Sequence, residues 1–136
     1  MARANEQYAY FSVTGDFAPD ELTRRLGVAP DSAWGKGDLH PRSGAARRFS
    51  RWSLESRLDR ESSLEAHIAD VLARMDGNAD AFVAVSREYG GCMQLVGYFH
   101  AGYPGLHFDA AIVAGLARYG LGVDFDFYHL WPHVDE

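Results

Sequence analysis

The sequence predicts an α+β domain whose sheet is mostly antiparallel or mixed and whose helices pack on one face, with a ferredoxin-like arrangement as the leading form. Three observations predict this fold class. Short runs of alternating apolar and polar residues are typical of half-buried strands. Longer runs with apolar residues three or four positions apart are typical of helices, and they separate most of the strand-like runs. One pair of adjacent glycines also lies between two strand-like runs, as in a tight hairpin.

The first part of the chain predicts a strand, a helix, a long loop and a second strand. Tyr8–Thr14 alternates with a period of two, which is typical of a strand. Pro19 suits the first turn of a helix, and Gly27 suits its end. Ala29–Arg48 contains prolines and glycines throughout, so we expect a long loop there. Phe49–Glu55 alternates again and predicts the second strand.

The middle of the chain predicts a helix followed by a hairpin. Ser62 and Glu65 have the spacing of a capping box, and the apolar stripe that follows them indicates a helix up to Gly77. The runs Ala81–Tyr89 and Cys92–His100 both resemble strands, and only two glycines separate them. Because glycine adopts the positive φ angles of a tight turn, we expect these runs to pair as a hairpin.

The last part of the chain predicts a helix and a closing strand. Asp109 can cap a helix that Gly120 would end. In the run that follows, apolar residues alternate with Asp124 and Asp126, which indicates a strand with one polar face. The residues expected to form one continuous core are Phe11, Trp52, Leu54, Ile68, Leu72, Val83, Val85, Leu95, Phe125 and Phe127.

Length and composition are those of one folded domain, which we place at residues 1–136. The hydrophobic fraction is 47% and the net charge is −6, so the chain is too apolar for disorder and repels nucleic-acid phosphates at long range. A lone Cys92 excludes an internal disulfide and a cysteine-based zinc site. No apolar run suits a signal peptide or a membrane span. We therefore expect a cytoplasmic protein that binds neither nucleic acid nor membrane.

Several segments, taken in order, resemble a known family. They are the opening YAYFSVTGDFAPDELTRRLGVAP, the GKGD of Gly35–Asp38, the WSLES of Trp52–Ser56 and the DFDFY of Asp124–Tyr128. The set resembles a bacterial family catalogued as domain of unknown function 4279, and the resemblance spans nearly the whole chain. It implies an α+β fold and brings no established activity or catalytic residues. Immunity proteins, which bind and silence a toxin, offer an analogy of size, charge and fold.

Candidate chemical sites each have a structural alternative. Asp124 and Asp126 share one strand face, as paired carboxylates in an enzyme would, but a solvated strand face has the same pattern. Lys36 lies between glycines, yet the spacing of a phosphate-binding P-loop is absent. His100 and His107 match no metal-binding spacing. We therefore expect no catalytic residue, metal or cofactor, although whether the chain is an enzyme stays open.

A binding or inhibitory module with a protein partner is the leading hypothesis for function. Six arginines lie between residues 42 and 60, and Trp34 offers more apolar area than a loop requires. The alternatives are a solvated arginine-rich surface and a tryptophan that folds over the edge of the core. The candidate binding residues are Trp34, Lys36, Asp38, Arg48 and Arg51. The alternative function is a small enzyme or ligand-binding protein with a site near Asp124, Asp126 and the GKGD loop.

Overall fold

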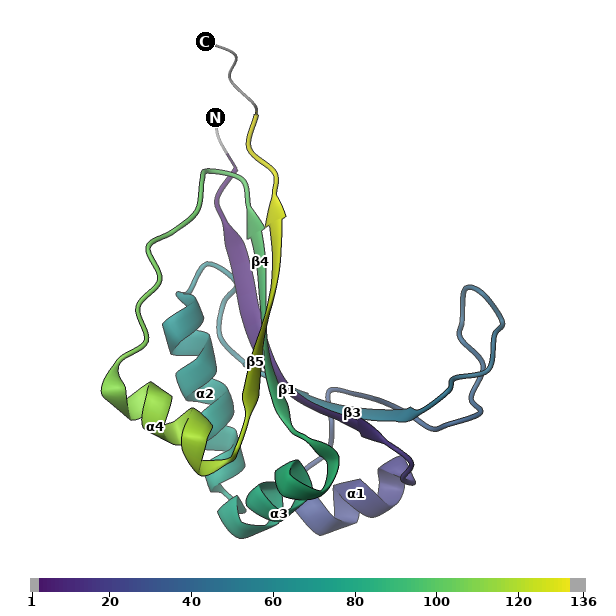
Figure 1. Ribbon diagram of the computed structural model, residues 1–136. Coiled ribbons are helices and arrows are strands. Elements are labelled where there is room, and N and C mark those ends of the chain that lie inside the picture. The colour runs from purple at the N-terminus through teal and green to yellow at the C-terminus, as the bar shows by residue number, and fades with distance from the viewer. Residues whose placement is uncertain (1–2, 133–136) are drawn as a thin grey trace.

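A mixed sheet with helices on one face makes up residues 3–132, the part of the chain that the computed structural model describes (Figure 1). In Figure 1 the sheet is bent, and the helices cover the outer side of the bend. Within residues 3–132, none of the helices combines the length and the apolar composition that a membrane crossing requires. The elements are β1 (Glu6–Gly15), α1 (Pro19–Leu26), β2 (Ser32–Trp34), β3 (Ser50–Glu55), α2 (Leu64–Asp76), α3 (Ala79–Tyr89), β4 (Cys92–Phe99), α4 (Ala110–Arg118) and β5 (Gly122–His129).

The order of the strands confirms the predicted fold class. The sheet runs β2-β3-β1-β4-β5, and neighbouring strands are antiparallel except for the parallel pair β4 and β5. The first four strands follow a β-α-β-β-α-β sequence with β1 between β3 and β4, which is the ferredoxin-like arrangement. The helix α3 and the unit α4–β5 are additions to it. The strand β5 follows α4, pairs with β4 in parallel and extends the sheet at one edge. A parallel pair needs such a crossover connection.

The first predicted elements are confirmed with small shifts. The helix α1 begins at Pro19 and ends at Gly27, whose φ of 73° lies in the left-handed region that favours glycine. The expected capping box is one residue off, because Ser63 rather than Ser62 caps α2 and accepts a hydrogen bond from the Ala66 N–H. The predicted loop Ala29–Arg48 is not entirely irregular, since it contains the short strand β2.

The predicted hairpin between residues 81 and 100 is wrong, because its first arm is the helix α3. Val83 and Val85 suggested a strand, but Phe82, Val85 and Ser86 are the buried residues and follow helical spacing. Gly90, expected in a hairpin turn, instead ends the helix with a φ of 70° and donates its N–H to the Ser86 carbonyl. Packing of α3 against β1 therefore outweighs the preference of the β-branched residues Val83 and Val85 for a strand.

The core lies between the helices and the inner side chains of the sheet. Phe11, Trp52 and Phe82 contact one another edge to face with centroids 5.4 to 6.2 Å apart, and all three are fully buried. The indole N–H of Trp52 donates to the Thr23 hydroxyl at 3.1 Å. Most of the predicted core is confirmed, but Phe125, which lies on the edge strand β5, is 56% exposed.

Because α3 is a helix, Phe82 is buried and Val83 is only partly buried, whereas a hairpin strand could turn Val83 inward. Replacing Phe82 with alanine should lower the free energy of unfolding by about 3–5 kcal/mol, because it empties a buried site between Phe11 and Trp52. The matched change Val83→Ala should cost about 1 kcal/mol or less, since Val83 is only partly buried. Urea melts of both variants measure this. A larger loss in Val83→Ala would favour a strand that turns Val83 inward.

Candidate binding surface on the open sheet face

One face of the sheet is not covered by the described helices. The alternation of side chains along the strands shows which residues point to this face. Because Phe11 and Trp52 point into the core, Tyr10 on β1 and Arg51 on β3 point to the opposite side. The antiparallel register of β2 and β3 places Trp34 beside Arg51 on the same side. The open face, as we call this side of the sheet, lies on the inside of the bend in Figure 1.

Trp34 and Arg51 form the centre of an arginine–aromatic group on this face. The Arg51 guanidinium lies 5.5 Å from the Trp34 ring centroid and 5.4 Å from that of Tyr10, and it donates to the Tyr10 hydroxyl at 2.8 Å. Arg47 covers the Trp34 ring at 3.9 Å. These distances are within the range of cation–π attraction. A hollow of about 200 Å³ opens beside the group, between β1, β2 and β3.

The aromatic surface continues along β1 and onto β4 and β5. The Tyr8 ring stacks on Tyr10 with centroids 6.0 Å apart, and the Arg60 guanidinium lies 4.3 Å from its centroid. Burial raises the pKa of the Tyr8 hydroxyl, so it stays a neutral donor and acceptor. Tyr98 and Tyr128 stack with centroids 5.1 Å apart and ring planes within 8°. The open face therefore joins a basic aromatic half on β1–β3 to a tyrosine pair on β4–β5.

The GKGD loop holds its own turn together. The Asp38 carboxylate accepts from the Gly35 N–H at 2.7 Å, and the Lys36 N–H donates to the Ser50 hydroxyl. The Lys36 ammonium lies 3.4 Å from the Asp16 carboxylate, and both side chains are exposed. An anion on the Gly35 N–H would meet the negative charge of Asp38. The loop thus supports the position of Trp34 and is unsuited to a phosphate.

Only part of the predicted binding set meets in space. Trp34 and Arg51 are in contact range, whereas Lys36 and Asp38 belong to the adjoining turn. Arg48 is exposed and takes no part in the arginine–aromatic contacts of the described residues. Four further residues of this face were not predicted as site residues from the sequence: Tyr8, Tyr10, Tyr98 and Tyr128. Their alternation with the apolar residues of the strands was the signal that could have found them.

The alternative site near Asp124, Asp126 and the GKGD loop is not assembled. The two aspartates lie on β5 and the loop follows β2, and these strands form opposite edges of the sheet. Asp124 accepts from the Gln94 amide at 2.8 Å, and Asp126 accepts from the Tyr128 hydroxyl at 3.2 Å. Burial raises the pKa of the neighbouring Cys92 thiol to about 11, so it is protonated and a poor nucleophile at neutral pH.

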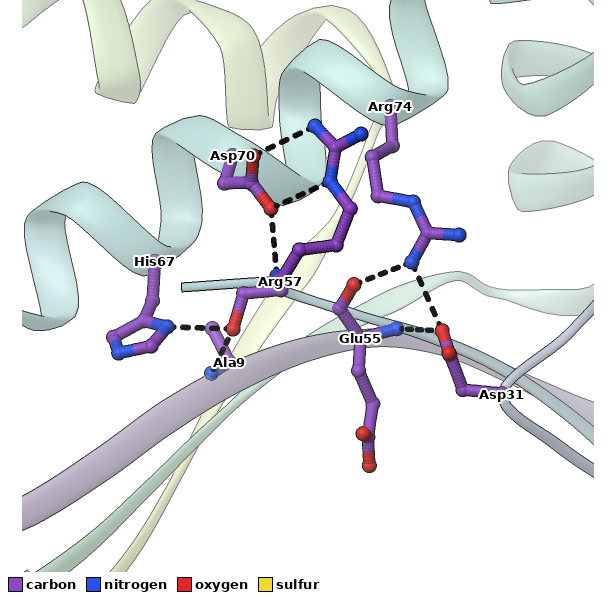
Figure 2. A network of polar contacts seen from close by, with 8 residues as sticks. Ala9, Asp31, Glu55, Arg57, His67, Asp70 and Arg74 are labelled. Carbon is purple, nitrogen blue, oxygen red and sulfur yellow. Dashed lines mark hydrogen bonds and ion pairs between the residues drawn. The ribbon is translucent and has the colours of Figure 1, made fainter. Parts of the chain in front are cut away.

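A polar network on the other side of the sheet fastens α2 to the end of β3 (Figure 2). Arg74 donates to the Glu55 carbonyl at 2.6 Å and to the Asp31 carboxylate at 2.9 Å. Arg57 makes two side-chain hydrogen bonds to Asp70 and thereby lowers the pKa of that carboxyl. Each contact joins α2 to the segment around β3, so the network stabilises the fold rather than presenting groups to a ligand.

Ser56 and His67 belong to the same network and resemble a nucleophile and its base. The Ser56 hydroxyl and the His67 Nδ1 are 2.6 Å apart, and the Ala9 N–H donates to the same hydroxyl. His67 is fully buried, however, so its ring is closed to solvent and to a substrate. Burial also lowers the pKa of His67, which keeps the ring neutral in the folded protein. The pair is a structural link between β1, β3 and α2.

Another hollow within residues 3–132 lies away from the open face. It is a groove of about 650 Å³ between α2 and α4, lined largely by small residues such as Ala69, Ala73 and Gly115. Leu72 packs so closely over Gly115 that a Cβ there would lie 2.8 Å from it, which lets the helices approach. In the same described part of the chain, no three His, Cys, Asp or Glu side chains cluster as metal ligands do.

The geometry defines an α+β protein with a ferredoxin-like strand order and an aromatic, arginine-bearing open sheet face. The family model for the domain of unknown function DUF4279 matches residues 5–130, so the chain belongs to this family, and the predicted resemblance is confirmed. Neither the curated proteins nor the solved structures compared with it gave a match. The description of this family names no activity.

The buried histidine makes stability depend on pH. Burial lowers the pKa of His67 below its ordinary 6.5, so between these two pKa values the unfolded chain binds more protons than the folded one. The stability that this pKa difference provides is therefore complete above pH 6.5 and is lost as the pH falls toward the lower pKa of the folded state. Urea melts at about pH 7.5 and about pH 5 should show a smaller loss in His67→Gln than in the wild type. Equal losses in the two proteins would show that His67 does not titrate differently on folding.

Proposed function

We propose that the chain is a non-enzymatic binding module that recognises a protein partner through the basic aromatic half of its open sheet face. One observation carries this proposal. The guanidinium groups of Arg47, Arg51 and Arg60 each lie within 5.5 Å of the centroid of an aromatic ring on this face, and none of them pairs with a carboxylate among residues 3–132. Arg25 and Arg57, by contrast, pair with carboxylates and lie over no aromatic ring among the described residues.

Contact with an aromatic ring favours the binding of a carboxylate by an arginine side chain. A guanidinium held flat over a ring keeps its N–H groups directed outward along its edges, where they match the geometry of a carboxylate. The ring also restricts the side chain, so less entropy is lost when a ligand binds. Tryptophan, tyrosine and arginine are the residues on which protein interfaces concentrate their binding energy. The expected partner therefore presents Asp or Glu side chains next to apolar ones.

Charge favours a protein over a nucleic acid as this partner. The chain has a net charge of −6, and Glu55, Asp124 and Asp126 lie on the same face as the three arginines. A nucleic acid long enough to cross the face would meet these carboxylates with its phosphates. A compact acidic segment of a protein can contact the basic half alone. In its narrower form, the proposal is that the chain is a bacterial, cytoplasmic inhibitor similar to an immunity protein.

The position of Trp34 favours a role in binding over a role in covering the edge of the core. Its ring is half-buried between arginines on the open face and does not pack into the core cluster. Trp34→Ala should therefore cost about 1 kcal/mol or less in thermal melts, whereas a tryptophan covering the core would cost about 3 kcal/mol or more. A loss of the larger size would assign Trp34 to the fold.

Affinity capture from the native host with paired variants tests the binding surface. Arg47→Glu with Arg51→Glu should abolish capture of the partner, because both charges at the Trp34 site are reversed. Arg24→Glu with Arg87→Glu is the control, since both residues are exposed on helices and the change in net charge is the same. The control should capture the partner as the wild type does.

Two outcomes would contradict the proposal. Equal capture by both double variants would place the interaction elsewhere on the surface. Capture that disappears after nuclease treatment would mean that the partner is a nucleic acid. Circular dichroism melts of the four-protein set (wild type, Trp34→Ala and the two double variants) exclude loss of folding as the cause.

A further inference from the structure

Among residues 3–132, no segment pairs with the outer edge of strand β5, so this edge is free along its length in the described part of the chain. The strand pairs with β4 from Gly122 to His129 and is the last strand of the sheet. Sheet edges in folded proteins are commonly blocked by proline, charged side chains, a bulge or a covering element. The sequence of β5, GVDFDFYH, contains no proline, and its charged residues Asp124 and Asp126 are both acidic, so they oppose an acidic strand but not a basic one. The other edge is the three-residue strand β2, which is too short to pair extensively.

The register of β5 shows which backbone groups face outward. The Gly122 N–H donates to the Gly91 carbonyl at 3.1 Å, and the Leu130 N–H donates to the Phe99 carbonyl at 2.9 Å. Because a parallel strand bonds to one neighbour through alternate residues, the even-numbered residues of β5 face β4. The N–H and C=O groups of Val123, Phe125 and Phe127 therefore point away from the sheet.

The side chains along this edge alternate in charge and polarity. On the open face, Asp124 and Asp126 accept hydrogen bonds from neutral groups and have no cationic partner among the described residues. On the helix side, Phe125 is 56% exposed and packs edge to face with Phe127 at 5.5 Å. A strand that complements this edge needs positive charge on one side and apolar side chains on the other.

We propose that the free edge of β5 accepts an extended strand from a partner protein in which Lys or Arg alternates with apolar residues. Backbone hydrogen bonds to the odd-numbered residues of β5 supply affinity, as in other cases of strand addition. Basic side chains pair with Asp124 and Asp126, and apolar side chains cover Phe125. This docking surface is separate from the arginine–aromatic group and does not depend on the function proposed for it.

A second copy of the chain is a poorer occupant of this edge. If two β5 strands pair antiparallel with Phe125 opposite Phe125, Asp124 of each copy lies opposite Asp126 of the other. Like charges directly opposite each other destabilise a strand pair. The two aspartates thus oppose self-association and favour a basic strand.

A labelled peptide tests the proposal directly. The probe is a fluorescein-labelled peptide of eight residues, the length of β5, in which lysine alternates with valine, and the control peptide replaces lysine with glutamate. Fluorescence anisotropy should show that the wild type binds the lysine peptide only. Asp124→Lys with Asp126→Lys should exchange this preference. Phe125→Pro should weaken binding by about tenfold or more, because it removes an outward N–H and leaves the bonds to β4 intact.

The outcomes separate this proposal from general charge attraction. Unchanged binding by Phe125→Pro, no binding by the wild type, or the same peptide preference after the lysine substitutions would each overturn it. A dimer in analytical ultracentrifugation that Phe125→Pro dissociates would also overturn it and assign the edge to a second copy. The exchange of preference does not require the proline variant to fold. Trp34→Ala should bind the peptide as the wild type does, which keeps the test independent of the open-face proposal.

Discussion

Three aromatic rings, those of Phe11, Trp52 and Phe82, pack edge to face in the core where β1, β3 and α3 meet. The Trp52 indole is also tied to α1 through Thr23. Edge-to-face contact between buried rings is favourable beyond the area that it buries, so this cluster strongly favours one orientation of the two strands. All four helices of residues 3–132 then lie on the side to which the rings point (Figure 1).

The open face is the direct consequence of that orientation. Successive residues of a strand point to opposite sides, so inward Phe11 requires outward Tyr10, and inward Trp52 requires outward Arg51. The ordered GKGD turn then carries the chain from β2 into the loop that brings Arg47 over Trp34. The residues that stabilise the core and those that form the candidate binding surface thus alternate along the same strands. A one-residue slip of β3 would exchange the two sets.

The features predicted correctly from the sequence are those that a local pattern determines. The alternation of β1 and the glycine at the end of α1 were both readable, because each depends on neighbouring residues. The helix α3 was missed because its valines and the glycines after it match a hairpin, while the contact with β1 that decides the matter is distant in sequence. The candidate binding surface was predicted only in part for the same reason. Arg51 and Tyr10 are separated by 41 positions, and only the strand order brings them together.

Hydroxyl-radical footprinting of the chain with its captured partner tests most directly whether the open face is the binding surface. Tyr8, Tyr98 and Trp34 lie on that face, whereas Tyr103 packs beside Phe99 on the other side and is 62% exposed. The partner should reduce oxidation at Trp34 and Tyr8 and leave Tyr103 unchanged. Protection of residues in the groove between α2 and α4, with Trp34 as reactive as in the free protein, would contradict the assignment.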